Sequence, residues 1–299
     1  MKSYILYTSQ TEYLMEKISK SSFSNNLQII SSNLNKDGKR YFPDGEIYVS
    51  LPHAFLKRFE NQNKRRGGRI VVLHSGVPNP NEGLVEFELT LQILKDNNIK
   101  PEVFFTYFPY GMQDKVFLKG ETNVAENLIE KLVNYYKVRR IFIIDPHFEG
   151  RKWLIKYPIF SISAIPLLCQ MAKEEFGKDV VFISPDKGGA RRAKIFNLKK
   201  RRVNSYKVKL YSRGLNFKGK TVGVVDDIIE TGGTLCKCAS FLRENGAKKI
   251  IALAVHGVLS KGISGVKKKF DKLYLTNTIQ NKEANFDISG LIINSLFRP

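Results

Sequence analysis

The sequence predicts an α/β protein made of two similar domains, each with a largely parallel central sheet flanked by helices. Short apolar runs rich in Val, Ile and Phe recur along the chain and are typical of buried parallel strands. Helical patterns lie between several of these runs, an alternation that indicates parallel sheets. The alternation occurs once in roughly the first half of the chain and again in the second half, which favours two domains over one long sheet.

The predicted strands share a short length and a continuous apolar character. In chain order they are Tyr4–Tyr7, Ile70–Leu73, Val103–Tyr107, Ile141–Ile144, Val180–Ile183, Thr221–Val225, Ile250–Val255 and Leu273–Leu275.

Two predicted helices are defined by apolar residues that recur on one face. The first carries these residues at Leu84, Phe87, Leu91 and Leu94. The second begins near Leu235, places Ala239 and Leu242 on one face, and ends at Gly246 before the next strand.

The join between the domains is expected near Trp153 to Pro158, although no Gly/Ser linker or low-complexity tract marks it. The predicted first domain is therefore residues 1–153 and the second is residues 154–299. The segment Phe42–Leu51 belongs to the first domain in this division. The last residues of the chain are a candidate to pack back on the first domain.

Composition limits the classes of protein to consider. The 299 residues with 42% hydrophobic content are enough for real cores, and the sequence has neither a long apolar span nor a signal peptide. We therefore expect a soluble, cytoplasmic protein with no membrane association. Cys169, Cys236 and Cys238 are too few for a disulfide framework and lack zinc-ribbon spacing. The formal net charge of +21 comes from scattered lysines and arginines without a nucleic-acid-binding motif, so nucleic acid is not expected as a partner.

The most informative stretch is Thr221–Leu235, TVGVVDDIIETGGTL, in which an apolar strand leads to a Thr-Gly-Gly-Thr turn that opens a helix. Gly232 and Gly233 allow close backbone approach, and the N–H groups at the helix start favour an anion. The hydroxyls of Thr231 and Thr234 add donors. Such a turn suits a monophosphate.

Asp226 and Asp227, just upstream of this turn, are placed to accept hydrogen bonds from the two ring hydroxyls of a pentose that carries the phosphate. They could also bind these hydroxyls through a magnesium ion. The plainer alternative is that the glycine pair makes an ordinary turn and that the two acids only end a strand. The whole string resembles the phosphoribosyl-pyrophosphate-binding signature, with Glu230 where that signature often has Asp or Ser.

Further motifs extend this resemblance. They are YFPDGEIYVSL at Tyr41–Leu51, PYGMQDKVFLKG at Pro109–Gly120, IDPHFEG at Ile144–Gly150 and SPDKGGARRA at Ser184–Ala193. In this order they resemble the ribose-phosphate pyrophosphokinase family, and most closely its short, archaeal-like members. The resemblance covers nearly the whole chain. It implies two phosphoribosyltransferase-like domains and transfer of the β,γ-diphosphate of ATP to ribose 5-phosphate, with ATP on the side of the first domain.

The resemblance implies residues for each substrate. ATP is expected to be bound by Phe42, Asp44, Glu46, Gln113, Asp114 and His147. Ribose 5-phosphate is expected to be bound by Asp226, Asp227, Thr231, Gly232, Gly233 and Thr234. The aromatic face and two carboxylates of the Phe42–Glu46 turn suit stacking on a purine and hydrogen bonding to its amino group. In this family the turn serves the ATP site of a neighbouring subunit, which implies a homo-oligomer, a dimer or larger. The alternative is a plain surface turn.

The resemblance also implies a magnesium site and two catalytic cations. Mg²⁺ is expected at His147 and Asp186, although a lone histidine is more often structural. Lys200 and Arg202 match the Lys-x-Arg pair of a mobile loop that stabilises transition-state charge. Neighbouring basic residues leave their register open by about one residue, and a solvated basic loop is the alternative.

One departure from the family stands at Met112, where the family commonly has arginine near the ATP. Lys115 is a candidate to compensate for this loss. Without compensation, the affinity for ATP is expected to be lower. The departure keeps open a non-catalytic regulatory relative of the synthetase. A phosphoribosyltransferase that consumes the activated sugar is a further alternative, but it has no need for the FPDGE and DPH motifs.

Overall fold

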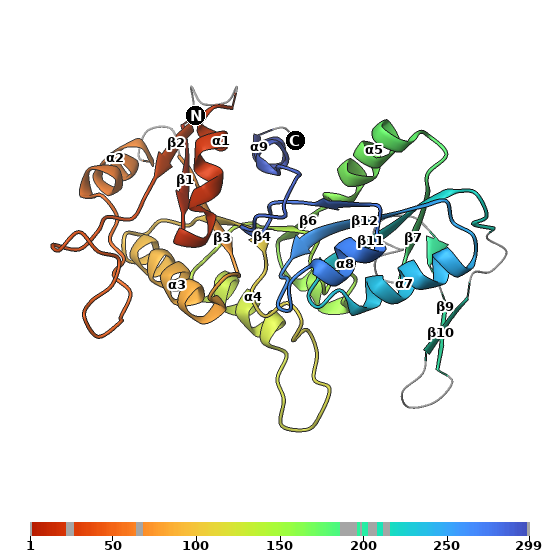
Figure 1. Cartoon of the computed structure of the whole chain (residues 1–299). Helices are drawn as coiled ribbons and strands as arrows, with labels where there is room; N and C mark the ends of the chain where they lie inside the picture. The colour runs from red at the N-terminus through yellow and green to blue at the C-terminus, as the bar shows by residue number, and fades with distance from the viewer. Residues whose placement is uncertain are drawn as a thin grey trace. The chain divides into compact units, whose positions relative to one another are not determined.

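The computed structural model describes residues 2–21, 27–63, 68–185, 196–197, 199–202, 208–211 and 216–297. The chain divides into two compact units, Met1–Ile162 together with Ser289–Pro299, and Ser163–Ile288 (Figure 1). The segment Met1–Ile162 of the first unit thus extends beyond residue 153, the predicted end of the first domain. No helix among the described residues is long and apolar enough to cross a membrane.

The first unit is built on a six-stranded sheet in which every strand pair is parallel. The strand order is β2-β1-β3-β4-β5-β6. The strands are β1 (Ser3–Tyr7), β2 (Leu27–Ile30), β3 (Arg69–Ser75), β4 (Glu102–Tyr107), β5 (Ile141–Ile144) and β6 (Ile159–Ile162). The helices are η1 (Ser9–Leu14), α1 (Met15–Ser19), α2 (His53–Asn63), α3 (Pro80–Asp96), α4 (Val124–Asn134), η3 (Lys152–Lys156) and α9 (Ser289–Phe297).

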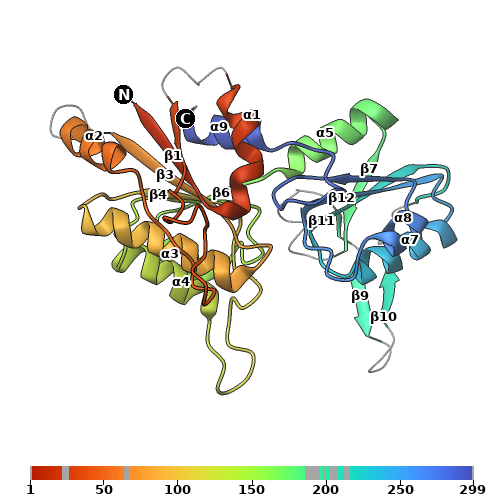
Figure 2. The same cartoon turned by 60° about the vertical axis from the view of Figure 1, so that its left-hand side comes forward.

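Helices cover both faces of this sheet. Alternate strand residues such as Val72 and Phe105 form one core with Phe87 of α3 and Leu132 of α4. Figures 1 and 2 show α3 and α4 on that side and α1 and α9 on the opposite side. The C-terminal helix α9 thus belongs to the first unit, although the chain reaches it only after the whole of the second.

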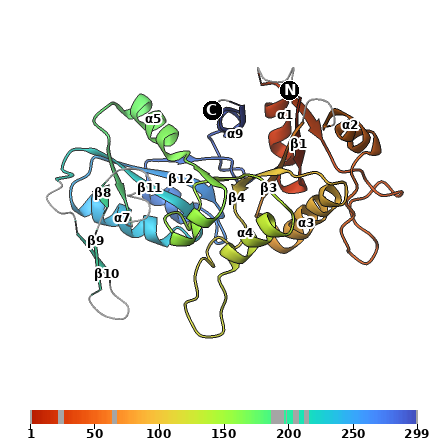
Figure 3. The same ribbon diagram turned by 180° about the vertical axis from the view of Figure 1, so that it is seen from behind.

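The second unit contains a parallel five-stranded sheet in the order β13-β12-β11-β7-β8. Its strands are β7 (Val181–Ser184), β8 (Phe196–Asn197), β11 (Thr221–Ile229), β12 (Lys249–Gly257) and β13 (Lys272–Leu275). The helices α5 (Ile165–Phe176), α7 (Gly233–Glu244) and α8 (Ser264–Lys269) accompany it, with α5 on one side and α7 and α8 on the other (Figure 1). An antiparallel ribbon of β9 (Lys199–Arg202) and β10 (Val208–Tyr211) projects from this unit (Figure 3).

The predicted α/β class with parallel sheets and flanking helices is confirmed, and each predicted strand has a counterpart. One boundary prediction was wrong. The strand predicted at Thr221–Val225 does not end before the two acids, because β11 continues through Asp226 and Asp227 to Ile229. Pairing with β12, including Asp226 opposite Ala254 and Ile228 opposite His256, keeps this stretch in the sheet.

Candidate active site

The strand order of the second unit locates its ligand crevice. From β7 the chain passes to β8 on one side and then to β11, β12 and β13 on the other. In such sheets ligands bind beyond the carboxyl ends of the strands at the point where the direction reverses, which here lies between β7 and β11. The Thr231–Thr234 turn directly follows β11, so the predicted phosphate loop stands at this point.

The Thr231–Thr234 turn needs glycine at its second position. Gly232 has φ 72° and ψ 1°, in the left-handed region, and precedes the first residue of α7. A Cβ at Gly232 would also lie 2.4 Å from Cγ2 of Val266 on α8. The N–H of Cys236 makes the first helical bond, to the carbonyl of Gly232 at 2.9 Å.

The turn is open to solvent at three of its four residues. Thr231, Gly233 and Thr234 are exposed, whereas Gly232 is buried. The N–H of Gly233 donates to Oγ1 of Thr231 at 3.4 Å. The first N–H groups of a helix have no intrahelical acceptor, and the positive end of the helix dipole lies at the same place. The turn therefore has the chemistry of a phosphate site.

Asp226 and Asp227 lie within the last part of β11 and are only 8% and 3% exposed. The N–H of Asp227 donates to Oδ1 of Asp226 at 3.1 Å. Two carboxylates are thus held on one strand, a few residues before the Thr231–Thr234 turn, called the phosphate turn below. This arrangement suits the recognition of hydroxyl groups on a phosphorylated sugar, and the oxygen donors suit a hard cation such as Mg²⁺.

The residues predicted to bind ATP after β4 and β5 lie at the carboxyl ends of neighbouring strands in the first unit. His147 and Gln113 are exposed there. Asp114 is 3% exposed, and both of its carboxylate oxygens accept hydrogen bonds from Arg151, at 2.6 Å from Nε and 3.0 Å from Nη2. The Asp114 carboxylate is therefore engaged within the chain, an interaction that the sequence did not indicate.

Met112 is 47% exposed at this same loop. The ammonium of Lys115 lies 4.3 Å from the ring centroid of Phe117, a cation–π contact that directs it to a neighbouring side chain. Arg151 is the cation that contacts the Gln113–Asp114 motif in the described structure.

The Phe42–Glu46 turn is the tip of a short antiparallel hairpin between β2 and α2. The N–H of Phe42 donates to the carbonyl of Glu46 at 2.8 Å, and Gly45 takes φ 91°. Oδ1 of Asp44 accepts from the N–H of Glu46 at 3.1 Å. The ring of Phe42 is 42% exposed and meets Tyr48 edge to face at 5.6 Å. An aromatic face and two exposed acids are thus presented to solvent.

The two predicted catalytic cations lie on the ribbon of the second unit. Lys200 pairs with Leu210 and Arg202 pairs with Val208 in the antiparallel register of β9 and β10. Asp186 lies outside the described residues. Among the residues that the structure describes, no three His, Cys, Asp or Glu side chains form a metal-binding group.

Comparison with known proteins places this geometry in a family. Residues 198–289 match the phosphoribosyl transferase domain model. The chain is 29% identical to ribose-phosphate pyrophosphokinase of Pyrococcus abyssi over 306 residues, which covers 98% of each chain. It is 30% identical to the enzyme of the same name from Pyrococcus furiosus over 268 residues, covering 85% of this chain and 90% of the relative.

The fold agrees with these sequence matches. The crystal structure of phosphoribosylpyrophosphate synthetase from Mycobacterium smegmatis superposes with a TM-score of 0.81 at 23% identity, covering 99% of this chain and 98% of the other. This likeness confirms the two-domain, phosphoribosyltransferase-like fold class. With the identity and coverage of the Pyrococcus relatives, it follows that the chain belongs to the ribose-phosphate pyrophosphokinase family.

Proposed function

We propose that this protein transfers the β,γ-diphosphate of ATP to the anomeric hydroxyl of ribose 5-phosphate, giving 5-phosphoribosyl 1-pyrophosphate and AMP. The observation that carries the proposal is the open Thr231–Thr234 turn at the reversal point of the second sheet, in a chain related to ribose-phosphate pyrophosphokinases over nearly its full length. A phosphoribosyltransferase could use the same turn. Such an enzyme, however, has no need for the FPDGE and DPH motifs of the first unit.

The second unit supplies the acceptor side. The backbone N–H groups and hydroxyls of Thr231–Thr234 hold the 5-phosphate at the start of α7. Asp226 and Asp227, fixed on β11, accept hydrogen bonds from the 2- and 3-hydroxyls of the ribose. The sugar is then oriented at both ends, which is the main contribution that an enzyme makes to phosphoryl transfer.

The reaction forms one bond and breaks another. The anomeric oxygen attacks the β-phosphorus of ATP and loses its proton, while the bond from that phosphorus to the α,β-bridging oxygen breaks and AMP leaves. Lys200 and Arg202, from the β9–β10 ribbon, stabilise the negative charge that spreads over the non-bridging oxygens.

The first unit supplies the donor side. Gln113 and His147 stand at the carboxyl ends of adjacent strands, where they contact the ATP. The Phe42–Glu46 turn provides the aromatic face and carboxylates for the adenine of a neighbouring subunit, so the active protein is a homo-oligomer in the cytoplasm.

Magnesium is the proposed cofactor, with His147 and Asp186 as the residues assigned to it. The chemistry of the site fits this ion, since Mg²⁺ binds through one or two carboxylates and substrate phosphates, and the Asp226–Asp227 pair offers further oxygens. The bound ion supplies charge neutralisation on the diphosphate.

The test is to incubate the purified protein with ATP, ribose 5-phosphate and Mg²⁺ and to follow AMP and phosphoribosyl pyrophosphate together. We expect both products to appear in equal amounts, and neither to appear when the sugar is omitted. If both substrates bind and neither product forms, the protein is a non-catalytic relative. A reaction that needs a nucleobase and releases pyrophosphate would instead identify a phosphoribosyltransferase.

A further inference from the structure

Two polar links tie the base of the Phe42–Glu46 turn to helix α3 of the same unit. The hydroxyl of Tyr41 donates to Glu82, and this bond, with burial, raises the pKa of Tyr41 to about 12. Arg40 lies 3.6 Å from Glu86 and 3.1 Å from Glu12. Both Arg40 and Tyr41 directly precede the turn, so these links act where the turn begins.

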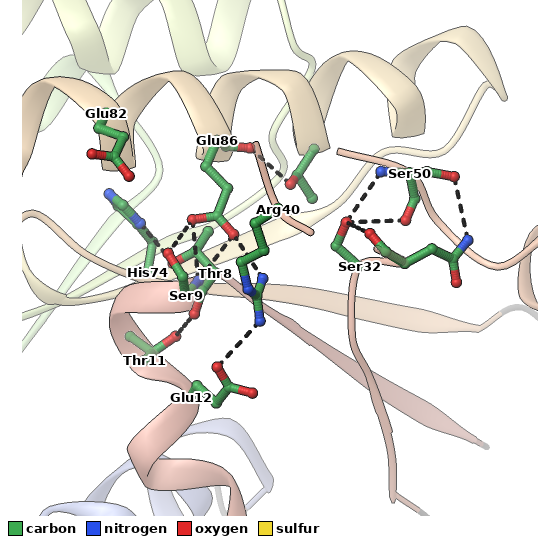
Figure 4. A network of polar contacts seen from close by, with 12 residues as sticks. Thr8, Ser9, Thr11, Glu12, Ser32, Arg40, Ser50, His74, Glu82 and Glu86 are labelled. Carbon is green, nitrogen blue, oxygen red and sulfur yellow. Dashed lines mark hydrogen bonds and ion pairs between the residues drawn. The ribbon is translucent and has the colours of Figure 1, made fainter. Parts of the chain in front are cut away.

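Glu86 is the buried centre of this network. It is 2% exposed and points from α3 toward Ser9 and Arg40, as Figure 4 shows. Its carboxylate accepts from the N–H of Ser9 at 3.0 and 3.1 Å and from the hydroxyl of Ser9 at 2.5 Å. Burial raises the pKa of Glu86, whereas the contacts with Ser9 and Arg40 oppose that rise. A buried carboxylate is costly unless it is paired and hydrogen-bonded, so its charge ties Ser9, α3 and Arg40 together.

The network stands at the reversal point of the first sheet. From β1 the chain passes to β2 on one side and to β3 on the other, so the ligand position of such a sheet lies beyond the carboxyl ends of β1 and β3. Ser9 directly follows β1, and Glu86 approaches it from α3. The equivalent position in the second unit carries the phosphate turn, whereas here a carboxylate occupies it and would repel a phosphate.

We propose that Tyr41, Glu82, Arg40 and Glu86 are positioning residues that hold the Phe42–Glu46 turn in the conformation that meets the nucleotide of a neighbouring subunit. This inference rests on the proposed function. The residues at the ligand position of the first sheet thus hold the Phe42–Glu46 turn in place, and the turn itself contacts the nucleotide of a neighbouring subunit. The residues themselves touch no substrate, and they lower the KM for ATP by keeping the turn ordered before binding.

The test compares two variants, each of which removes one tyrosine hydroxyl that bonds a residue of helix α3. Tyr41→Phe keeps the ring but removes the bond to Glu82. We expect the KM for ATP to rise roughly fivefold, as for the loss of one hydrogen bond, with kcat and the KM for ribose 5-phosphate within about twofold. Hydrogen exchange of the amides of residues 40–48 is expected to accelerate. Tyr135→Phe is the matched control, because its hydroxyl bonds Gln92 further along α3, at 3.1 Å, and it should leave both readouts unchanged.

Variants of Glu82 complete the design. Glu82→Gln keeps an acceptor for the Tyr41 hydroxyl and should retain a KM for ATP near that of the unmodified protein. Glu82→Leu should match Tyr41→Phe, and the double variant should be no worse than either single one. These results would support the inference.

Unchanged amide exchange in Tyr41→Phe would show that the bond from Tyr41 to Glu82 does not order the Phe42–Glu46 turn, and this would overturn the inference. Faster exchange with an unchanged KM for ATP would show an ordered turn that does not serve the nucleotide, and this also overturns the inference. Neither result depends on whether the diphosphate transfer occurs, which the unmodified protein alone decides. If that protein forms no product, the Kd for ATP replaces its KM, with the same expected change.

Discussion

Cγ2 of Val266 lies 2.4 Å from the point where a side chain at Gly232 would place its Cβ. The position thus excludes a side chain on two grounds, because Gly232 also has a φ of 72°. Helix α8 carries Val266 and contacts α7, so the packing of α7 and α8 fixes the shape of the phosphate turn.

Gly232→Ala should therefore damage the turn. The left-handed conformation costs a residue with a Cβ about 1–2 kcal/mol, and the clash adds to this. We expect the KM for ribose 5-phosphate to rise at least roughly tenfold, measured by steady-state kinetics with ATP saturating. Gly262→Ala is the control, since Gly262 has φ 73° but open space for a Cβ. Val266→Ala should partly rescue Gly232→Ala; a second variant no better than the first would refute the steric explanation.

Lys200→Ala tests the catalytic role proposed for the β9–β10 ribbon. Loss of one charge-stabilising donor should lower kcat by roughly a hundredfold or more, while the Kd for ribose 5-phosphate changes little. Single-turnover measurements and titration of the sugar separate these effects. Lys209→Ala, on the partner strand β10, should keep most of the activity. A Lys200→Ala variant with normal turnover would remove this lysine from its proposed role.

Met112→Arg tests the departure from the family pattern at the proposed ATP site. The position is 47% exposed, so arginine fits without a loss of packing. A guanidinium near the triphosphate adds a charge-assisted contact, and we expect the KM for ATP to fall by roughly three- to tenfold. Met112→Leu should not change it. An unchanged KM in the arginine variant would indicate that another cation already fills this place.

His74 should make stability depend on pH. It is fully buried on β3, and burial lowers its pKa from 6.5 to about 3. Below about pH 6.5 this histidine is protonated in the unfolded chain but stays neutral in the folded protein. Its contribution to stability is therefore fully present above pH 6.5 and is lost as the pH falls toward the folded pKa.

As the pH falls, the free energy of unfolding should decrease in the unmodified protein. The slope of this decrease should exceed that of His74→Asn by up to about 1.4 kcal/mol per pH unit. Urea denaturation between about pH 5 and 7.5 measures both slopes in the range where His74 acts. His53→Asn, which alters an exposed histidine, should keep the steep slope. Equal slopes in the His74→Asn and unmodified proteins would contradict the prediction.

The sequence revealed the interior of both sheets better than their edges. The run Ile141–Ile144 reads as a strand because β5 is buried along its whole length. β2 and β6 escaped prediction because they are edge strands with only half-buried or exposed side chains, which weakens the apolar signal. The acids of β11 were misread as a strand end, since aspartate is depleted in strands.

The candidate site was predictable where its chemistry is local in sequence. The Thr231–Thr234 turn can be recognised in the sequence because its glycines and hydroxyls lie within four consecutive residues. The ion pair of Asp114 with Arg151 and the contacts of Glu86 with Ser9 join residues far apart in the chain. No spacing rule reveals such pairs, because only the folded sheet brings the ends of β1, β3 and β4 close to these partners.

Helix α9 also sets an order of events during synthesis. Its residues Ile292, Ile293 and Leu296 are buried, and its last turn is held by Arg69, which donates to the carbonyl of Leu296 and stacks on Phe297. The ribosome makes this helix only after the entire second unit. The first unit therefore emerges first and is completed last, and the apolar surface that α9 covers stays exposed while the second unit is made.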